Sequence, residues 1–252
     1  MSLFQNPKPV SKFGKVAICL SGKIRTGINA YSVFKNFFGY LNADIFFHTW
    51  EDEPNLPEVI DLYKPKKYLT TKSKQFQNMV SFGPMLYSIM MANEVKKNYE
   101  IEHNFRYDLV IKTRFDLVFL PGHHFPDHAL IPRTIYSSGG NQGINPVDFE
   151  SHGISDLLFW GDSQSMDIAT DTYFYYRHHC IPLNRQFKTG HQFDPNDVYF
   201  SPGNLIYSHF KKYNIDCFKN VPFISEIPWR EDVSELHPII DYGKIKKRYE
   251  QG

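Results

Sequence analysis

The chain has 252 residues, 42% of them hydrophobic and 22% charged, and a formal net charge of +1. This composition argues against a largely disordered chain, and the small net charge gives no general attraction to nucleic acid or to an anionic membrane. The three cysteines lack C-x-x-C spacing, which argues against a disulfide framework or a zinc knuckle and favours a reducing compartment. No apolar run has the length of a membrane span, and the first residues lack the apolar core of a signal peptide, so we expect a cytoplasmic protein.

Strands and helices are expected to alternate in the first half of the chain. The predicted strands are Val16–Ser21, Asp44–Thr49, Lys67–Thr70 and Tyr107–Lys112, and the predicted helices are Ile28–Leu41, Pro57–Tyr63 and Phe82–Asn104. On the last helix the predicted inward stripe is Met85, Ile89, Ala92, Val95 and Tyr99, with Glu94, Lys97 and Glu100 outside. This alternation predicts an α/β fold with a mostly parallel sheet and helices on both of its faces.

The second half of the chain is less regular. Residues 134–153 are rich in Gly, Ser and Asn and predict a loop. A strand is expected at Leu157–Trp160, followed by a helix that Asp162 or Ser163 caps and that runs to about His178. Ser201-Pro202 begins another predicted helix that ends near Tyr213, and short strands are expected near Cys217 and Phe223. There is no internal repeat and no clear domain boundary.

Polar or charged residues directly follow three of the predicted strands. They are Ser21-Gly22-Lys23, His48-Thr49-Trp50 and Thr113-Arg114-Phe115-Asp116. Ligands of open α/β sheets bind outside the carboxyl ends of the strands. We therefore expect the functional site at this edge of the sheet.

The segment from Ser21 to Gly27 is the first candidate. It joins a strand to a helix, contains two glycines and offers backbone amides at a helix start, which suits a phosphate or a nucleotide. Lys23 and Arg25 are candidates to pair with a diphosphate, Arg25 in bidentate fashion. Because the segment matches neither G-x-x-x-x-G-K-[ST] nor G-x-G-x-x-G, a plain turn with solvated basic residues remains the alternative.

The segment Lys112-Thr113-Arg114-Phe115-Asp116 is the second candidate. A carboxylate just past a buried strand, here Asp116, can hold a divalent metal through its oxygens. Such a metal would bridge two phosphates and offset the charge of a departing nucleoside diphosphate, and Arg114 can do part of that work without a metal. The alternative is a simple Arg–Asp ion pair at a strand end.

Four segments, in this order, resemble glycosyltransferases that occur in bacterial surface-polysaccharide clusters and in large DNA viruses. They are VAICLSGKIRTG, ADIFFHTW, FGPMLYSIMMANEVKKNYE and YDLVIKTRFDLVF. The K-x-R-x-D pattern at residues 112–116 also resembles WavE-type lipopolysaccharide synthesis proteins. The resemblance covers roughly residues 14–120, and it is the ordered set of segments that carries it.

The resemblance implies a GT-A fold, a nucleotide-sugar donor, a glycan or oligosaccharide acceptor, and often Mn²⁺ or Mg²⁺. It implies that Ser21, Gly22, Arg25 and Thr26 line the nucleotide site, and Trp50, Tyr87 and Asn93 are further candidates for contacts with the base, ribose or donor sugar. It also places Arg114-Phe115-Asp116 where GT-A enzymes carry a D-x-D motif, with Arg114 in place of the first Asp. One domain over residues 1–252 would then have a nucleotide-binding half at 14–120 and an acceptor-binding half at 121–252.

A sugar transfer with inversion needs a carboxylate that takes the proton of the acceptor hydroxyl. The candidates are Asp156, Asp162, Asp194 and Asp197. Asp197 is the first choice, because the segment around it resembles the motif that supplies the base in inverting GT-A enzymes, and Asp156 is the second. For each aspartate the alternative is a cap or turn residue. Two rival functions remain open, a sugar-phosphate nucleotidyltransferase and a non-catalytic nucleotide- or glycan-binding module.

Overall fold

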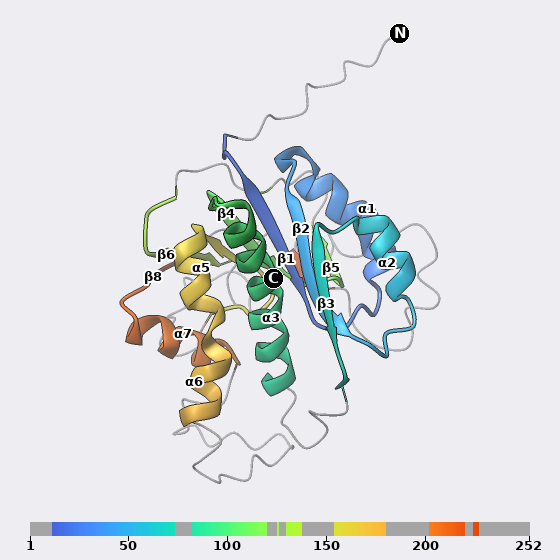
Figure 1. The fold of residues 1–252 in the computed structure, drawn as a ribbon. Helices are drawn as coiled ribbons and strands as arrows, with labels where there is room; N and C mark the ends of the chain where they lie inside the picture. The colour runs from blue at the N-terminus through green and yellow to red at the C-terminus, as the bar shows by residue number, and fades with distance from the viewer. Residues whose placement is uncertain are drawn as a thin grey trace, which may run out of the picture.

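A seven-stranded sheet with helices on both faces forms the centre of the computed structural model (Figure 1). The structure describes residues 12–73, 82–119, 125, 130–137, 154–179, 202–219 and 224–226. The strands are β1 (Val16–Ser21), β2 (Asp44–Trp50), β3 (Lys67–Thr71), β4 (Leu109–Thr113), β6 (Thr134–Ser137), β7 (Phe159–Gly161) and β8 (Asp216–Lys219). Two short strands, β5 (Leu117–Phe119) and β9 (Ile224–Glu226), pair with each other in a second sheet.

The order of the strands in the main sheet is β3-β2-β1-β4-β7-β6-β8. β1 pairs in parallel with β2 and β4, and β2 pairs in parallel with β3. β7 is antiparallel to its two neighbours, β4 and β6, whereas β6 and β8 are parallel. The predicted mostly parallel sheet is confirmed, and strands from both halves of the chain share it.

The helices are α1 (Gly27–Phe38), the 3-10 turn η1 (Gly39–Leu41), α2 (Leu56–Tyr63), α3 (Phe82–His103), α5 (Ser163–Thr170), α6 (Thr172–His179) and α7 (Pro202–Lys212). α1 and α2 pack on one face of the sheet, and α3, α5, α6 and α7 pack on the other (Figure 1). The side chains of β1 alternate between these two cores, with Ile18 and Leu20 in one and Ala17 and Cys19 in the other. β1 is apolar from Val16 to Leu20 because both of its faces are covered.

Helix α3 differs from its prediction on one face. Ile89 and Ala92 of the predicted inward stripe are buried, but Glu100, expected outside, is only 1% exposed, and Lys96 is fully buried. α3 lies between the sheet and helices α5 and α6, so two of its faces are covered rather than one. The helical spacing of apolar residues identified the apolar buried face of α3, but it did not identify the second buried face, which is polar.

The second half of the chain brings two further corrections. Residues 134–137, predicted as the start of a loop, form β6, while the remainder of that loop, 138–153, lies outside the described residues. The helix predicted to run to about His178 is divided at Asp171 into α5 and α6. Asp162 caps α5 as expected, because its Oδ1 accepts a hydrogen bond from the Ser165 amide at 2.9 Å. Across the described ranges, none of the helices is both long and apolar enough to span a membrane.

Candidate functional site

The order of the main sheet reverses between β1 and β4. From β1 the chain proceeds outward to β2 and then β3, and it returns to place β4 on the opposite side of β1. β1 and β4 are parallel, with Leu20 opposite Thr113, so their carboxyl ends lie together. In open α/β sheets the ligand binds outside the carboxyl ends at such a reversal, the switch point of the sheet.

Two segments meet at this switch point, residues 22–27 after β1 and residues 114–116 after β4. A methyl group added at Gly27 would lie 2.9 Å from Cβ of Phe115, so the start of α1 touches the second segment directly. Only glycine permits so close an approach. The contact therefore holds residues 22–27 close to residues 114–116.

Arg25, Arg114 and Asp116 form what we call the arginine cluster. Arg25 Nη1 donates a hydrogen bond to Asp116 Oδ2 at 2.9 Å. Arg114 donates from Nε to Oδ1 at 2.8 Å and from Nη2 to Oδ2 at 2.7 Å. The Asp116 side chain is 7% exposed, whereas those of Arg25 and Arg114 are 34% and 19% exposed. Two guanidinium groups that solvent can reach thus share one sheltered carboxylate.

The backbone of the first segment is held so that Arg25 reaches Asp116. Arg25 has a φ of +46°, in the left-handed region that costs an ordinary residue roughly 1–2 kcal/mol. The preceding Ile24 is buried, and its amide donates to Glu53 Oε2 at 3.0 Å. Burial raises the pKa of Glu53, against the opposing effects of this hydrogen bond and of the charge on Lys23. The exposed Lys23 adds a second cation to the segment.

A second anchor fixes Gly22, whose φ of +100° suits glycine. Its amide donates to Ser88 Oγ at 2.7 Å and to the His48 carbonyl at 3.2 Å. The His48 ring lies between Ser88 Oγ and Thr71 Oγ1, at 2.8 Å from each. Burial lowers the pKa of His48 to about 4, so the ring is neutral at pH 7. Two backbone amides of the segment predicted to bind a phosphate, those of Gly22 and Ile24, are therefore hydrogen-bonded within the protein.

Asp156 lies at the same edge of the sheet. It precedes β7, and Phe159 of β7 pairs with Lys112 in antiparallel fashion, which places the start of β7 at the carboxyl end of β4. Asp156 is half-buried, and its carbonyl oxygen accepts a hydrogen bond from Lys112 Nζ. Burial lowers the pKa of Lys112 to about 7, and the charge of Asp156 partly opposes that effect. Asp197 lies outside the described residues.

The other predicted site residues occupy different surroundings. Ser21 is buried at the end of β1, and Thr26 is half-buried, with its carbonyl oxygen accepting from the Ala30 amide at 3.0 Å. Trp50 is buried at the end of β2 and meets the half-buried Tyr87 with ring centroids 6.4 Å apart and ring planes 18° apart.

Asn93 is buried in α3, where its Nδ2 donates to Asp167 Oδ1 at 3.0 Å. The structure thus brings the predicted residues of the two segments to the same edge of the sheet as Asp156. Asn93 instead lies beside Asp167, in a different cluster.

The described residues do not fit a divalent cation at Asp116. Both carboxylate oxygens already accept hydrogen bonds from positively charged groups. A cation there would face the guanidinium groups of Arg25 and Arg114. Within the part of the chain that the structure describes, no group of three or more His, Cys, Asp or Glu side chains is placed to hold a metal ion.

Three residues that support the site were not selected from the sequence. Ser88 and Glu53 each accept from a backbone amide of the first segment, and His48 joins Ser88 to β3. His48 was noted at a strand end, but its buried contacts had no local signal. Such contacts depend on which helices and strands become neighbours in the fold. The residue pattern of a single strand or helix does not contain that information.

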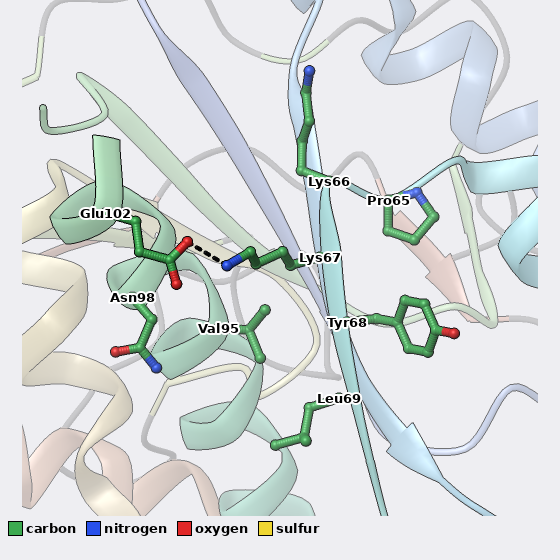
Figure 2. Close-up of a pocket in the computed structure, with 8 residues that line it drawn as sticks. All are labelled: Pro65, Lys66, Lys67, Tyr68, Leu69, Val95, Asn98 and Glu102. Atoms are coloured by element: carbon green, nitrogen blue, oxygen red, sulfur yellow. Dashed lines mark hydrogen bonds and ion pairs between the residues drawn. The ribbon is translucent and has the colours of Figure 1, made fainter. Parts of the chain in front are cut away.

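A shallow groove lies elsewhere on the molecule, between β3 and the carboxyl-terminal half of α3, with a volume of about 480 Å³. Its lining residues are Pro65, Lys66, Lys67, Tyr68, Leu69, Val95, Asn98 and Glu102, and Figure 2 shows Lys67 and Glu102 pointing toward one another as an ion pair. Glu102 follows Ser88 by fourteen residues along α3, about 21 Å of helix. The groove therefore lies toward the opposite end of the sheet from the switch point, and none of the predicted site residues lines it.

No protein-family model matches the chain, and no curated protein matches its sequence. Among solved structures, it is similar to a glycosyltransferase involved in the glycosylation of the major capsid of PBCV-1, with 8% identity, a TM-score of 0.41 and 83% of each chain covered. It is also similar to the apo form of the glycosyltransferase GlyE of Streptococcus pneumoniae TIGR4, with 10% identity and a TM-score of 0.45, over 95% of this chain and 64% of that one. The chain thus spans less than two thirds of the length of GlyE. At such low identities and TM-scores, this likeness assigns neither a family nor an activity to the chain.

Proposed function

We propose that the protein is a glycosyltransferase that moves a sugar from a nucleoside-diphosphate sugar to a carbohydrate acceptor. The observation that carries the proposal is the arginine cluster, in which Arg25 and Arg114 share the single carboxylate Asp116 at the switch point of the sheet. Guanidinium groups that solvent can reach attract anions, and the switch point is where sheets of this kind bind ligands. The resemblance of residues 14–120 to glycosyltransferases supports the same conclusion.

The chemistry of the cluster suits a diphosphate. A guanidinium group presents its N–H donors in a planar fork that matches two phosphate oxygens, and hydrogen bonds between charged partners are the stronger ones. Arg25 and Arg114 come from segments on the two sides of the switch point, so they can contact a diphosphate from two directions. Lys23 offers a third cation.

In the proposed transfer, the oxygen of an acceptor hydroxyl attacks the anomeric carbon of the donor sugar. The bond from that carbon to the diphosphate oxygen breaks, and its electron pair leaves with the nucleoside diphosphate. Arg25 and Arg114 stabilise the negative charge that develops on the leaving group. The hydroxyl proton passes to a carboxylate, for which Asp197 and then Asp156 are the proposed bases. A single displacement of this kind inverts the configuration at the anomeric carbon.

The first test is a thermal-shift screen of UDP, GDP, ADP, CDP and their sugar conjugates. A ligand at 100 times its dissociation constant stabilises a fold by about 2.7 kcal/mol, which is easily detected. Hydrolysis of the bound donor, and transfer to added oligosaccharides, then measure turnover. Binding without turnover would indicate a nucleotide-binding module, and the absence of binding by any nucleotide would contradict the proposal.

A pair of variants tests the location of the site. Arg114→Gln removes a charged donor and should weaken nucleotide binding by about 10- to 100-fold, since a hydrogen bond to a charged group contributes about 1.5–3 kcal/mol. Lys66→Gln is the matched control, because Lys66 is half-exposed and pairs with Asp44 at the amino end of β2. Equal losses in the two variants would argue against nucleotide binding at the switch point.

A further inference from the structure

Asp156 is a partly exposed acidic residue in a buried stretch of the chain. In the range 154–161 every other residue is buried, and Asp156 alone is half-buried. The stretch is also attached to α7, because the Ile154 amide donates a hydrogen bond to the Gly203 carbonyl oxygen at 3.1 Å. The protein therefore leaves one ionisable residue accessible at the carboxyl end of β4, on a backbone that is held in place.

The carboxylate of Asp156 is free within the part of the chain that the structure describes, where it makes no hydrogen bond and no ion pair. Two other carboxylates considered from the sequence are occupied, since Asp116 accepts from two guanidinium groups and Asp162 caps α5. The hydrogen bond that supports the turn at Asp156 comes from its neighbour, because the Leu157 amide donates to Ser155 Oγ at 3.3 Å. A cap or turn role for the Asp156 side chain would need such a hydrogen bond of its own.

Lys112 contacts the backbone of Asp156 from inside the sheet. The Lys112 side chain is 1% exposed, and its Nζ donates to the Asp156 carbonyl oxygen. Phe159, three residues after Asp156, pairs with Lys112 across the two antiparallel strands, so the ammonium group lies beside the start of β7. Among the described residues Lys112 forms no ion pair, and an ammonium group is costly to bury without one. An apolar side chain would serve the fold better, so stability does not account for this lysine.

The charges around Lys112 belong to the same site. Those that act on its ammonium group are Asp156, Arg114 and Asp116. The two carboxylates oppose the effect of burial, which lowers the pKa of Lys112, and the guanidinium group adds to it. Lys112 is therefore the residue through which Asp156 and the arginine cluster are connected.

We propose that Lys112 is a positioning residue that holds Asp156 in place as the general base of the proposed transfer. As the acceptor oxygen bonds to the anomeric carbon and the nucleoside diphosphate leaves, the hydroxyl proton passes to a carboxylate oxygen of Asp156. The inference rests on the proposed function. Of the two bases proposed there it selects Asp156, because this carboxylate is free and its backbone is held from within the sheet.

A double-mutant cycle tests the inference. Turnover is measured as release of UDP or GDP from UDP-glucose, UDP-N-acetylglucosamine and GDP-mannose, with water or added oligosaccharides as acceptor. Asp156→Asn should lower kcat by about 100-fold or more, because a general base contributes about 10²–10⁴-fold. Lys112→Met keeps the length of the side chain without its donor and should lower kcat by about tenfold or more, since a small misplacement of a catalytic group can cost about 100-fold. Calorimetry should give a Kd for UDP or GDP within about threefold of wild type in both variants.

The double variant separates positioning from a general effect on the fold. If Lys112 acts through Asp156, Lys112→Met combined with Asp156→Asn should have a kcat within about threefold of Asp156→Asn alone. Losses that multiply would overturn the positioning role. Lys96→Met is the matched lysine control, because Lys96 is also fully buried but joins α3 to α5, and the folded variant should keep the wild-type kcat. Asp61→Asn removes a carboxylate from an exposed position of α2 and should also leave kcat unchanged.

The outcomes distinguish this inference from the proposed function. If the wild-type protein turns over a donor and Asp156→Asn keeps a kcat within about threefold of it, the inference is wrong and the proposed function stands. If the wild-type protein binds no nucleotide, or binds one without turnover, both are wrong. Because Asp156 is half-buried and its carboxylate supports no described contact, Asp156→Asn should fold, so this comparison decides the question even if Lys112→Met does not fold.

Discussion

Two clusters of charged side chains lie on different parts of this molecule, one at the switch point of the sheet and one between α3 and α5. The arginine cluster at the switch point has two cations and one carboxylate. The second cluster, which we call the buried network, joins Lys96 and Arg106 to Glu100 and Asp167, with two charges of each sign, and Arg106 is its exposed member at 56%. Lys96 Nζ lies 3.0 Å from Glu100 Oε2 and 2.8 Å from Asp167 Oδ1, and its side chain is fully buried.

The difference in position separates a structural role from a binding role. In the buried network each charge meets its opposite, and Ser163 and Asn93 supply further hydrogen bonds, so α3 is held to α5 and no charge is left in excess. Buried charges require such pairing, because an unpaired one is costly. The arginine cluster lies at the switch point, and its two guanidinium groups are 34% and 19% exposed, which suits a site that an anion approaches.

The largest expected effect concerns the buried network. Lys96→Met leaves Glu100 and Asp167 without their buried partner and should lower the free energy of unfolding by about 3–5 kcal/mol. Lys97→Met, one position along the same helix, breaks only a half-exposed pair with Glu94 and should cost less than about 1 kcal/mol. Urea denaturation measures both. Nucleotide affinity of the folded Lys96→Met protein should be unchanged, and a large loss of affinity would remove the distinction between the two clusters.

A second effect concerns His48, which braces the loop beside the arginine cluster. Its folded pKa of about 4 lies below the ordinary 6.5, so between these pH values the unfolded chain binds a proton that the folded chain does not. The contribution of His48 to stability is therefore complete above pH 6.5 and is lost as the pH falls toward 4. At about 1.4 kcal/mol per pH unit, the loss amounts to about 3 kcal/mol. Between pH 6.5 and 4, the free energy of unfolding of His48→Gln should therefore fall by about 3 kcal/mol less than that of the wild-type protein. Urea denaturation at each pH measures both.

His209→Gln is the matched control. Burial also lowers the pKa of His209 to about 4, and its Nε2 lies 2.7 Å from the Ile168 carbonyl oxygen, on the side of the buried network. The two variants should show similar changes in pH dependence. Only His48→Gln should also weaken nucleotide binding, because it removes the support of Ser88 and Gly22. Equal nucleotide affinities in the two variants would show that the hydrogen bonds from His48 through Ser88 to Gly22 do not contribute to nucleotide binding.

The smallest effect concerns the contact that joins the two segments of the site. In Gly27→Ala the new methyl group would lie 2.9 Å from Cβ of Phe115, and relief of that overlap should cost about 1–3 kcal/mol and displace the segments of the site. Gly39→Ala is the control, since the nearest atom to its added methyl group is Lys35 Cγ at 3.8 Å and its φ is −60°. It should be neutral or stabilise by up to about 1 kcal/mol. Thermal unfolding and nucleotide titration of the pair would reveal any coupling between packing and binding.

Much of the parallel half could be predicted from the sequence. The apolar runs of β1 and β2 and the periodicity of α1 and α3 depend on local pattern, and their observed bounds lie within a few residues of the predicted ones. Those patterns also placed the switch-point residues at strand ends. The short strand β6 was missed, because four residues at the edge of a Gly- and Ser-rich stretch carry too little pattern of their own.

The pairings of charged side chains were the least predictable part. The position of Glu100 on α3 predicts an outward-facing side chain. It is buried because α5, more than sixty residues later in the chain, packs against it and supplies the Ser163 hydroxyl as a hydrogen-bond donor. Asp116 is the predicted metal ligand, with an Arg–Asp ion pair as the alternative, and the structure contains that ion pair with Arg114. The second partner, Arg25, reaches Asp116 from a left-handed turn that its residue type does not indicate.

The strand order that creates the switch point also has a consequence during synthesis. β1 lies between β2, which follows it closely, and β4, whose Leu109 pairs with Val16, 93 positions earlier in the chain. At ribosomal rates of about 5–20 residues per second, one edge of a strand that is apolar up to Ser21 stays open for roughly 5–20 seconds in the emerging chain. An unpaired strand edge readily captures another chain. The arrangement that brings Arg25 to Asp116 in the finished protein therefore leaves one edge of β1 unpaired in the nascent chain until β4 is made.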